Sequence, residues 1–131
     1  MALDVDLLRG NFALVLGRNP NLTARFYDVL FERHPEAKPL FGRNSRAAQE
    51  QMLAGALSAV MDHLDNAPWL TETLHALGEK HRGYGVTPEM YGWVGDSLLF
   101  VLAEASGPDW TPRHQAEWAE AYGVVVALMQ S

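Results

Sequence analysis

The chain of 131 residues contains no cysteine. This absence excludes disulfides, thiolate-bound zinc, iron–sulfur clusters, a cysteine nucleophile and covalent cofactor attachment through a C-x-x-C-H motif. The sequence also lacks an apolar run near the roughly 18 residues that span a bilayer. Its first residues include Asp4 and Asp6 and lack the basic segment of a secretory signal. We therefore expect a cytoplasmic protein with no membrane partner.

Basic residues are scarce as well. Ten Lys and Arg stand against 16 Asp and Glu, the formal net charge is −6, and the basic residues are scattered. We expect no nucleic-acid partner, because such partners select clustered positive charge. The motifs of phosphate-binding loops, dinucleotide folds, serine hydrolases and H-E-x-x-H metalloproteases are absent. A single E-x-x-H, from Glu72 to His75, falls short of the two pairs and two further glutamates that a di-iron bundle requires.

What the sequence does contain is a series of amphipathic helices. Hydrophobic residues make up 48% of the chain, which is long enough for one domain with its own core. Apolar residues recur at helical spacing and no alternating strand pattern occurs, so the fold class predicted is all-α. Proline and capping residues set the predicted boundaries. These are Asn19-Pro20, His34-Pro35, Asn66-Ala67-Pro68, Thr87-Pro88, Gly107-Pro108 and Thr111-Pro112, with a short turn over 35–41 and a loop over 42–45.

His81 differs from the other four histidines, which lie at helix ends or beside polar residues. One and two turns before it come Gly78, Leu77 and Leu74. An imidazole in such surroundings, with a glycine beside it, suits a metal ligand that points into an apolar pocket. A core histidine bonded to a backbone carbonyl explains the same pattern, and the residues alone favour that second interpretation.

Tyr27 and Gln49 are two further candidates. Tyr27 shares a helical stripe with Thr23 and Leu30, so its ring is expected to be buried and its hydroxyl needs a partner. A tyrosine at the rim, with its hydroxyl in water, is the alternative. Gln49 stands at the start of the apolar stripe that continues through Met52, and by itself it is typical of a surface glutamine.

Three segments together resemble a known family. Residues 26–41 match its F-Y-x-x-x-F…P-E-x-x-x-x-F pattern, residues 80–91 its K-H-x-x-x-x-V-x-P-E-x-Y pattern, and residues 118–124 its A-W-x-x-A-Y-G-V pattern. They occur in the family's order and cover almost the whole chain. The sequence is similar to the globin domain of flavohaemoglobins and to related single-domain bacterial haemoglobins. The resemblance implies a globin fold over 1–131, a three-over-three helical sandwich that encloses haem b.

The resemblance also implies a role for each matching residue. His81 corresponds to the proximal ligand of the haem iron, and Tyr91 to a tyrosine that hydrogen-bonds near it. Tyr27 and Gln49 correspond to the distal pair that faces bound gas. Further positions that match the haem pocket are Phe41, packed flat on the haem, Leu53, which crowds the open iron position, and Leu57, Leu77, Val86, Val94, Leu98 and Tyr122 in the wall. Lys80 and Arg82 are expected within reach of the haem propionates.

The sequence departs from the family in three places. The loop over 42–45 is short, so Gln51 is the alternative to Gln49. The chain stops at Gln130-Ser131, before a glutamate that bonds the proximal histidine in flavohaemoglobins, so we expect weaker electron donation to the iron. The flavin and nicotinamide reductase domain of flavohaemoglobins is not among these 131 residues, so we expect any turnover to take its electrons from elsewhere.

The resemblance leaves several functions open. We expect a protein that reversibly binds dioxygen and other diatomic gases for storage, delivery or scavenging. Nitric oxide dioxygenase activity with a separate reductase partner is the alternative. A gas sensor would need an output partner, and a helical interaction module without haem would lack the pigment.

Overall fold

The computed structural model describes residues 3–42 and 44–131, and these residues form helices joined by short turns and loops, with no strand among them. The prediction of an all-α fold is therefore confirmed. The elements are α1 (Val5–Arg18), α2 (Leu22–Arg33), the 3-10 helix η1 (Pro35–Phe41), α3 (Arg46–Asp62), α4 (Ala67–Gly83), α5 (Pro88–Ser106), the 3-10 helix η2 (Gly107–Asp109) and α6 (Pro112–Met129).

Most helices begin where the capping residues predict. Thr87 and Thr111 precede α5 and α6, each with proline at the first helical position. Ser45 and Asn66 cap α3 and α4 by accepting backbone N–H bonds from Ala48 and Trp69, at 3.1 and 3.2 Å. These side chains satisfy donors that the helix leaves unpaired, so each start is fixed locally.

The start predicted for α2 at Asn19-Pro20 is wrong by two residues. The helix begins at Leu22, after Asn21. The Asn19 side chain accepts a hydrogen bond from the Asn21 backbone N–H at 3.1 Å, and the Asn19 carbonyl accepts one from Leu22. Asn19 therefore closes a turn that contains Pro20, instead of capping the helix.

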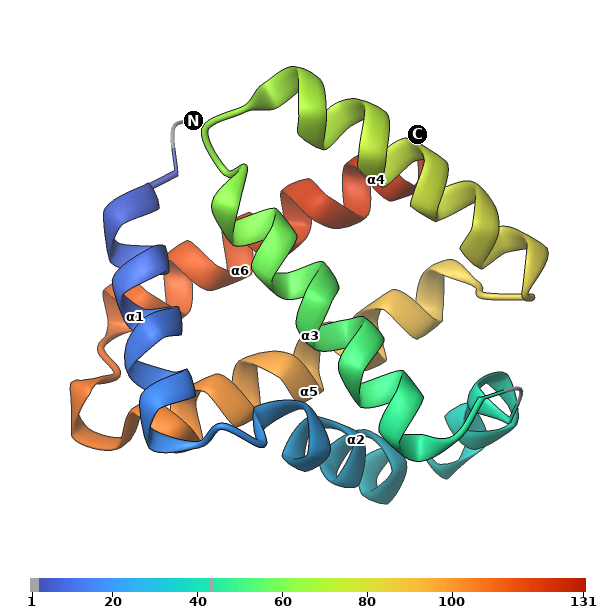
Figure 1. Ribbon diagram of the computed structural model, residues 1–131, viewed down its shortest axis with the longest axis horizontal. Helices are drawn as coiled ribbons and strands as arrows, with labels where there is room; N and C mark the ends of the chain where they lie inside the picture. The colour runs from blue at the N-terminus through green and yellow to red at the C-terminus, as the bar shows by residue number, and fades with distance from the viewer. Residues whose placement is uncertain (1–2, 43) are drawn as a thin grey trace.

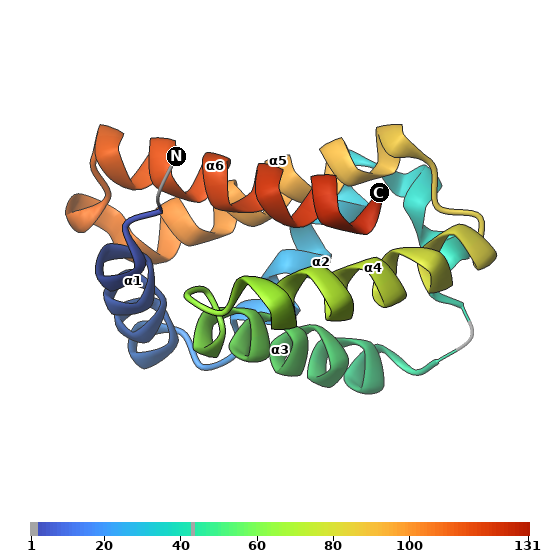
Figure 2. The same cartoon turned by 90° about the horizontal axis from the view of Figure 1, so that it is seen from above.

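The helices form two layers (Figure 1). α3 and α4 lie in one layer and α5 and α6 in the other, with α1 across one end (Figure 2). α2 packs closely on both α5 and α3, while α4 packs on α6. From the turn that joins them, α3 and α4 diverge, so the start of α3 and the end of α4 are far apart (Figure 1).

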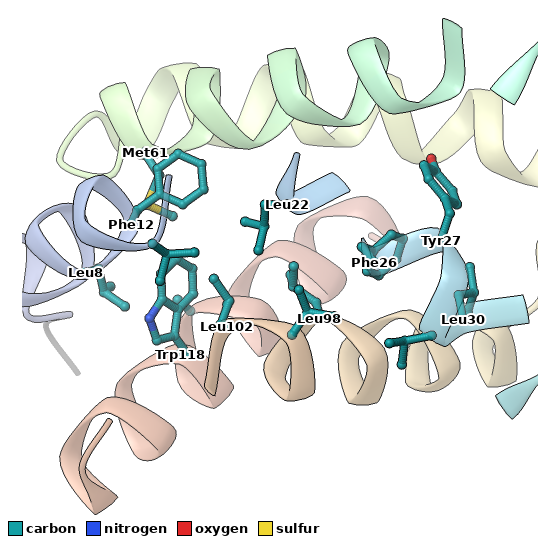
Figure 3. Packing of buried hydrophobic residues seen from close by; sticks show 14 of the residues in the cluster. Leu8, Phe12, Leu22, Phe26, Tyr27, Leu30, Met61, Leu98, Leu102 and Trp118 are labelled. Carbon is teal, nitrogen blue, oxygen red and sulfur yellow. The ribbon is translucent and has the colours of Figure 1, made fainter. Parts of the chain in front are cut away.

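The core lies where α1, α2, α5 and α6 meet. Its largest buried side chains include Leu8, Phe12, Leu22, Leu30, Leu102 and Trp118 (Figure 3). A buried polar chain crosses it: Trp118 donates to Asn11 at 2.9 Å, and Asn11 donates to Ser106 at 3.0 Å. Ser106 in turn donates to the Leu102 carbonyl, so each polar group in this chain is paired.

Two glycines allow α6 to approach its neighbours. A Cβ atom on Gly78 of α4 would lie 1.7 Å from the Met129 carbonyl oxygen of α6. One on Gly95 of α5 would lie 2.6 Å from the Tyr122 ring. Gly78 therefore allows the close contact between α4 and α6. The sequence had instead suggested that this glycine makes room in an apolar pocket around His81. This contact places the last turn of α4, which carries His81.

Replacing Gly78 tests that contact. We expect Gly78→Ala to lower the free energy of unfolding by roughly 2–3 kcal/mol, because the added methyl group collides with backbone that cannot rotate away. Urea denaturation measures the change. Gly10→Ala is the matched control: Gly10 lies in helix α1 with no atom near its missing Cβ, so this variant should be as stable as the wild type or more stable. Equal stability of Gly78→Ala and wild type would contradict the packing argument.

Candidate functional site

His81 lies in the last turn of α4 and is half-buried. Its Nδ1 is 2.8 Å from the Leu77 carbonyl oxygen, one turn earlier. A carbonyl only accepts, so Nδ1 carries the hydrogen and donates it. Nε2 then has a free lone pair, and no described residue forms a hydrogen bond or ion pair with it. This is the arrangement of a histidine oriented by one nitrogen for metal binding through the other. The backbone carbonyl bond of the second interpretation is therefore present. The metal-ligand interpretation stays a prediction, and this geometry is compatible with it.

Tyr91 of α5 stacks on this imidazole. The two ring centroids are 6.3 Å apart and the planes differ by 19°. Tyr91 is buried, and burial raises the pKa of its phenol, while nearby Arg82 opposes the rise. Tyr122 of α6 donates to the Tyr91 carbonyl at 2.5 Å and fixes its backbone. Within the described residues the contact between Tyr91 and His81 is this stack, and no hydrogen bond joins them.

Tyr27 is buried, with only 4% of its surface exposed, which contradicts the alternative of a tyrosine at the rim. Its ring packs against Phe26, Phe31 and Phe41 at centroid distances of 5.1, 5.7 and 5.4 Å. The hydroxyl points toward α3 (Figure 3) and donates to the Gln49 backbone carbonyl at 3.4 Å. That distance is long for an O–H···O bond, so this contact is weak.

Burial raises the pKa of Tyr27 to about 12, with Arg46 opposing the rise and Glu50 adding to it. The cause is the cost of placing a phenolate among aromatic rings, away from water. A tyrosine hydroxyl is protonated at neutral pH, and the raised pKa extends the range in which this one can donate to higher pH.

A pocket of about 250 Å³ opens beside Tyr27. Its lining residues come from α2, η1 and α3, and they are Tyr27, Phe31, Lys38, Phe41, Arg46 and Gln49. Gln49 lines this pocket, whereas Gln51 is exposed. The geometry thus brings Gln49, and not Gln51, to Tyr27.

The other predicted residues fall into two groups. Leu53, Leu57, Val94 and Tyr122 are partly buried against the core that holds Tyr27, and Leu98 lies within it. Leu77 and Val86 pack with Tyr91 in a second cluster, on the His81 side. Most residues predicted to line the haem pocket therefore lie in two separate clusters, one around Tyr27 and one around Tyr91. His81 does not line the pocket beside Tyr27.

The two predicted basic residues differ from each other. Lys80 is exposed on α4. Arg82 is exposed too, but its Nη1 donates to the Met129 carbonyl at 3.3 Å and so ties α4 to α6. Arg82 is therefore already engaged in a structural contact.

The possible metal-binding side chains fit haem better than a bare metal ion. Within residues 3–42 and 44–131 no group of three or more acidic, histidine or cysteine side chains is placed to hold a bare metal ion. A single imidazole with a free Nε2, flanked by aliphatic and aromatic side chains, suits a metal that arrives with its own macrocyclic ligands. The residues present therefore fit haem.

Comparisons with known proteins identify the family of the chain. The family model for globins matches residues 24–129. The chain belongs to the globin family. As a member it is a haem-binding globin with the predicted all-α globin fold, so the predictions of family and fold are confirmed.

The curated relatives include flavohemoproteins. The one from Bacillus anthracis is 32% identical over 124 residues, which is 92% of this chain and 30% of that protein. The one from Rhodopirellula baltica is 35% identical over 117 residues, covering 88% of this chain and 29% of that protein. The chain thus spans about three tenths of the length of these relatives.

Two solved structures are similar. One is an engineered carbene transferase made from a putative nitric oxide dioxygenase of Rhodothermus marinus, with a TM-score of 0.81, 29% identity and coverage of 95% of this chain and 87% of that one. The other is a bacterial globin from Campylobacter jejuni, with a TM-score of 0.77, 22% identity and coverage of 94% and 88%. The second likeness bears on the fold alone. Across the described residues, none of the helices has the length and apolar character needed to cross a membrane.

The buried state of Tyr27 can be tested by alkaline titration. We expect the phenolate absorbance that develops near pH 12 to shrink in Tyr27→Phe, because this phenol ionises later than an exposed one. The unfolded chain releases this proton near pH 10, so the raised pKa makes stability fall from there up to about pH 12. Tyr27→Phe should reduce that fall in urea denaturation. If the variant instead lost absorbance near pH 10, Tyr27 would be exposed in solution.

Proposed function

We propose that this globin holds haem b through His81 and binds dioxygen reversibly beside Tyr27 and Gln49. The observation that carries the proposal is the His81 geometry: Nδ1 is committed to the Leu77 carbonyl at 2.8 Å and Nε2 keeps its lone pair. Haem, when bound, supplies an iron with one open position for a diatomic gas.

His81 and Tyr91 form the proximal side in this proposal. The Leu77 carbonyl selects the imidazole tautomer and limits rotation of the ring, so Nε2 would remain available to hold the iron. The Tyr91 ring supports the imidazole, and Tyr122 holds Tyr91 in place. Leu77 and Val86 exclude water from this side.

Tyr27 and Gln49 form the distal side. The Tyr27 hydroxyl is a protonated donor inside an aromatic enclosure, and the Gln49 amide offers a second donor. A hydrogen bond to a gas ligand that carries partial negative charge contributes about 1–3 kcal/mol. Two such bonds slow dissociation of dioxygen by roughly two to three powers of ten. Carbon monoxide develops less charge and gains less.

The walls of the proposed haem pocket come from both clusters. Phe41 would pack against the haem, and Leu53 would limit the space for the gas. The remaining contacts are Leu57, Val94, Leu98 and Tyr122 from the first cluster and Leu77, Val86 and Tyr91 from the second. Lys80, which is exposed on the helix of His81, would pair with a propionate.

Nitric oxide dioxygenase activity is the second candidate. The names of two kinds of relative favour it: the flavohemoproteins and the putative nitric oxide dioxygenase. The proposal needs a reductase that returns electrons to the haem after each turnover. A stopped-flow mix of the oxygenated protein with nitric oxide, followed by a multiple-turnover assay with a reductase, separates the two functions. Sustained nitrate formation would establish the enzyme, and a single turnover would support the carrier.

The ligand assignment predicts that His81→Ala loses haem or holds it at least about tenfold more weakly, because no other nitrogen base takes its place. Absorption spectra of the ferric and ferrous protein, with hemin titration, measure this. His75→Ala is the matched control, since His75 lies on the same helix but is exposed. Unchanged ferrous spectra and full haem retention in His81→Ala would rule out the assignment.

The distal assignment predicts that Tyr27→Phe raises the dissociation rate of dioxygen about tenfold or more, because one charge-assisted hydrogen bond is lost. Stopped-flow displacement by carbon monoxide measures the rate. Phe keeps the packing against Phe31 and Phe41, so the effect isolates the hydroxyl. A rate equal to that of the wild type would show that the hydroxyl points away from the gas.

A further inference from the structure

Arg46, the first residue of α3, makes contacts that reach beyond its own helix. Its Nε donates to Glu50 Oε2 at 2.7 Å. Its Nη2 donates both to the Ala24 carbonyl at 2.7 Å and to Asp28 Oδ1 at 2.9 Å. One guanidinium therefore joins the start of α3 to two successive turns of α2.

The same guanidinium lies beside the distal aromatic residues. Its central carbon is 5.5 Å from the Tyr27 ring centroid and 5.9 Å from that of Phe31. These distances are within the range of cation–π attraction. Arg46 also lines the pocket that contains Tyr27 and Gln49.

Helix capping does not explain these contacts. Ser45 already caps α3 through its own side chain. Arg46 instead fixes where α3 sits on α2, the helix on which α3 packs most closely among the described elements. Gln49 is three residues from Arg46 on α3, and Tyr27 adjoins Asp28 on α2. The Arg46 contacts thus span the same two helices as the 3.4 Å contact between the Tyr27 hydroxyl and the Gln49 carbonyl.

We infer that Arg46 is a positioning residue that holds α3 against α2 and so keeps the Tyr27 hydroxyl and Gln49 at the distance that retains a bound gas. The inference rests on the proposed function of Tyr27 and Gln49. Isolated ion pairs at a surface contribute little to stability, and Arg46 is 43% exposed. Its effect is therefore on geometry, which the planar guanidinium fork sets through several acceptors at once.

A double-mutant cycle tests this. We expect R46M to raise the dissociation rate of dioxygen about fivefold in the protein with Tyr27, because the hydroxyl loses its fixed position. In the Tyr27→Phe background the same change should raise the rate less than about twofold, since the donor is already gone. R46K should resemble R46M, because an ammonium cannot reproduce the fork. Equal effects in both backgrounds, or a wild-type rate in R46K, would overturn the inference.

R25M is the matched control. Arg25 also lies on α2 and forms a bidentate ion pair, with Glu104 of α5 at 2.8 and 2.9 Å, but it is absent from the pocket lining. Its loss should leave dioxygen dissociation within about twofold of the wild type. An increase equal to that of R46M would mean that any ion pair on α2 has this effect, and the specific role of Arg46 would be rejected.

A measurement without haem keeps the test independent of the proposed function. Hydrogen exchange of the haem-free protein should be at least about threefold faster over residues 46–52 in R46M than in the wild type, and unchanged there in R25M. If Tyr27→Phe alone leaves gas dissociation unchanged, the proposed function fails, while faster exchange in R46M would still support the contact between α3 and α2. Unchanged exchange in R46M would overturn the inference whatever the gas kinetics show.

Discussion

The hydrogen bond between His81 Nδ1 and the Leu77 carbonyl, 2.8 Å long, determines which nitrogen of the imidazole remains for other chemistry. Its direction depends on the backbone of α4, and the position of α4 depends on its packing against α6 at Gly78 and Met129. A larger side chain at Gly78 would displace the turn that carries His81. The backbone bond would move with the helix, so the tautomer would survive while the direction of Nε2 changed. The orientation of one side chain is thus set by the contact of two helices.

The residues that we propose for the proximal and distal sides of the haem are held by different interactions. On the His81 side, hydrogen bonds to backbone carbonyls dominate: His81 donates to Leu77 and Tyr122 donates to Tyr91. On the Tyr27 side the ring is held by aromatic packing, and its hydroxyl makes one weak contact. A metal ligand needs a fixed direction, whereas a donor to a small ligand must be free to exchange partners. The two kinds of restraint suit these two tasks.

The sequence predicted the features whose causes are local. Thr87 and Thr111 were recognised as helix starts because each cap precedes a proline and acts on its own first turn. The predicted start of α2 was wrong because asparagine can either cap a helix or close a turn, and the residues next to Asn19 do not decide between these two roles. The sequence did not indicate the roles of Asn11 and Arg46, because their partners are distant in the chain. The partners of Asn11 lie 95 and 107 residues away. Those of Arg46 lie 18 and 22 residues away, on α2. The individual site residues came from resemblance, and spacing alone did not separate Gln49 from Gln51.

The weakness of the Tyr27 contact has a consequence for ligand binding. A hydroxyl bonded strongly to the Gln49 carbonyl would have to break that bond before it could donate to a gas, and the cost would offset most of the gain. At 3.4 Å little is lost. A phenol is protonated at neutral pH in any case, and burial, which raises its pKa to about 12, extends that state to higher pH. In the proposed function the energy of a hydrogen bond in this enclosure is therefore available to a gas ligand, and the aromatic packing of Phe31 and Phe41 holds the donor without competing for it.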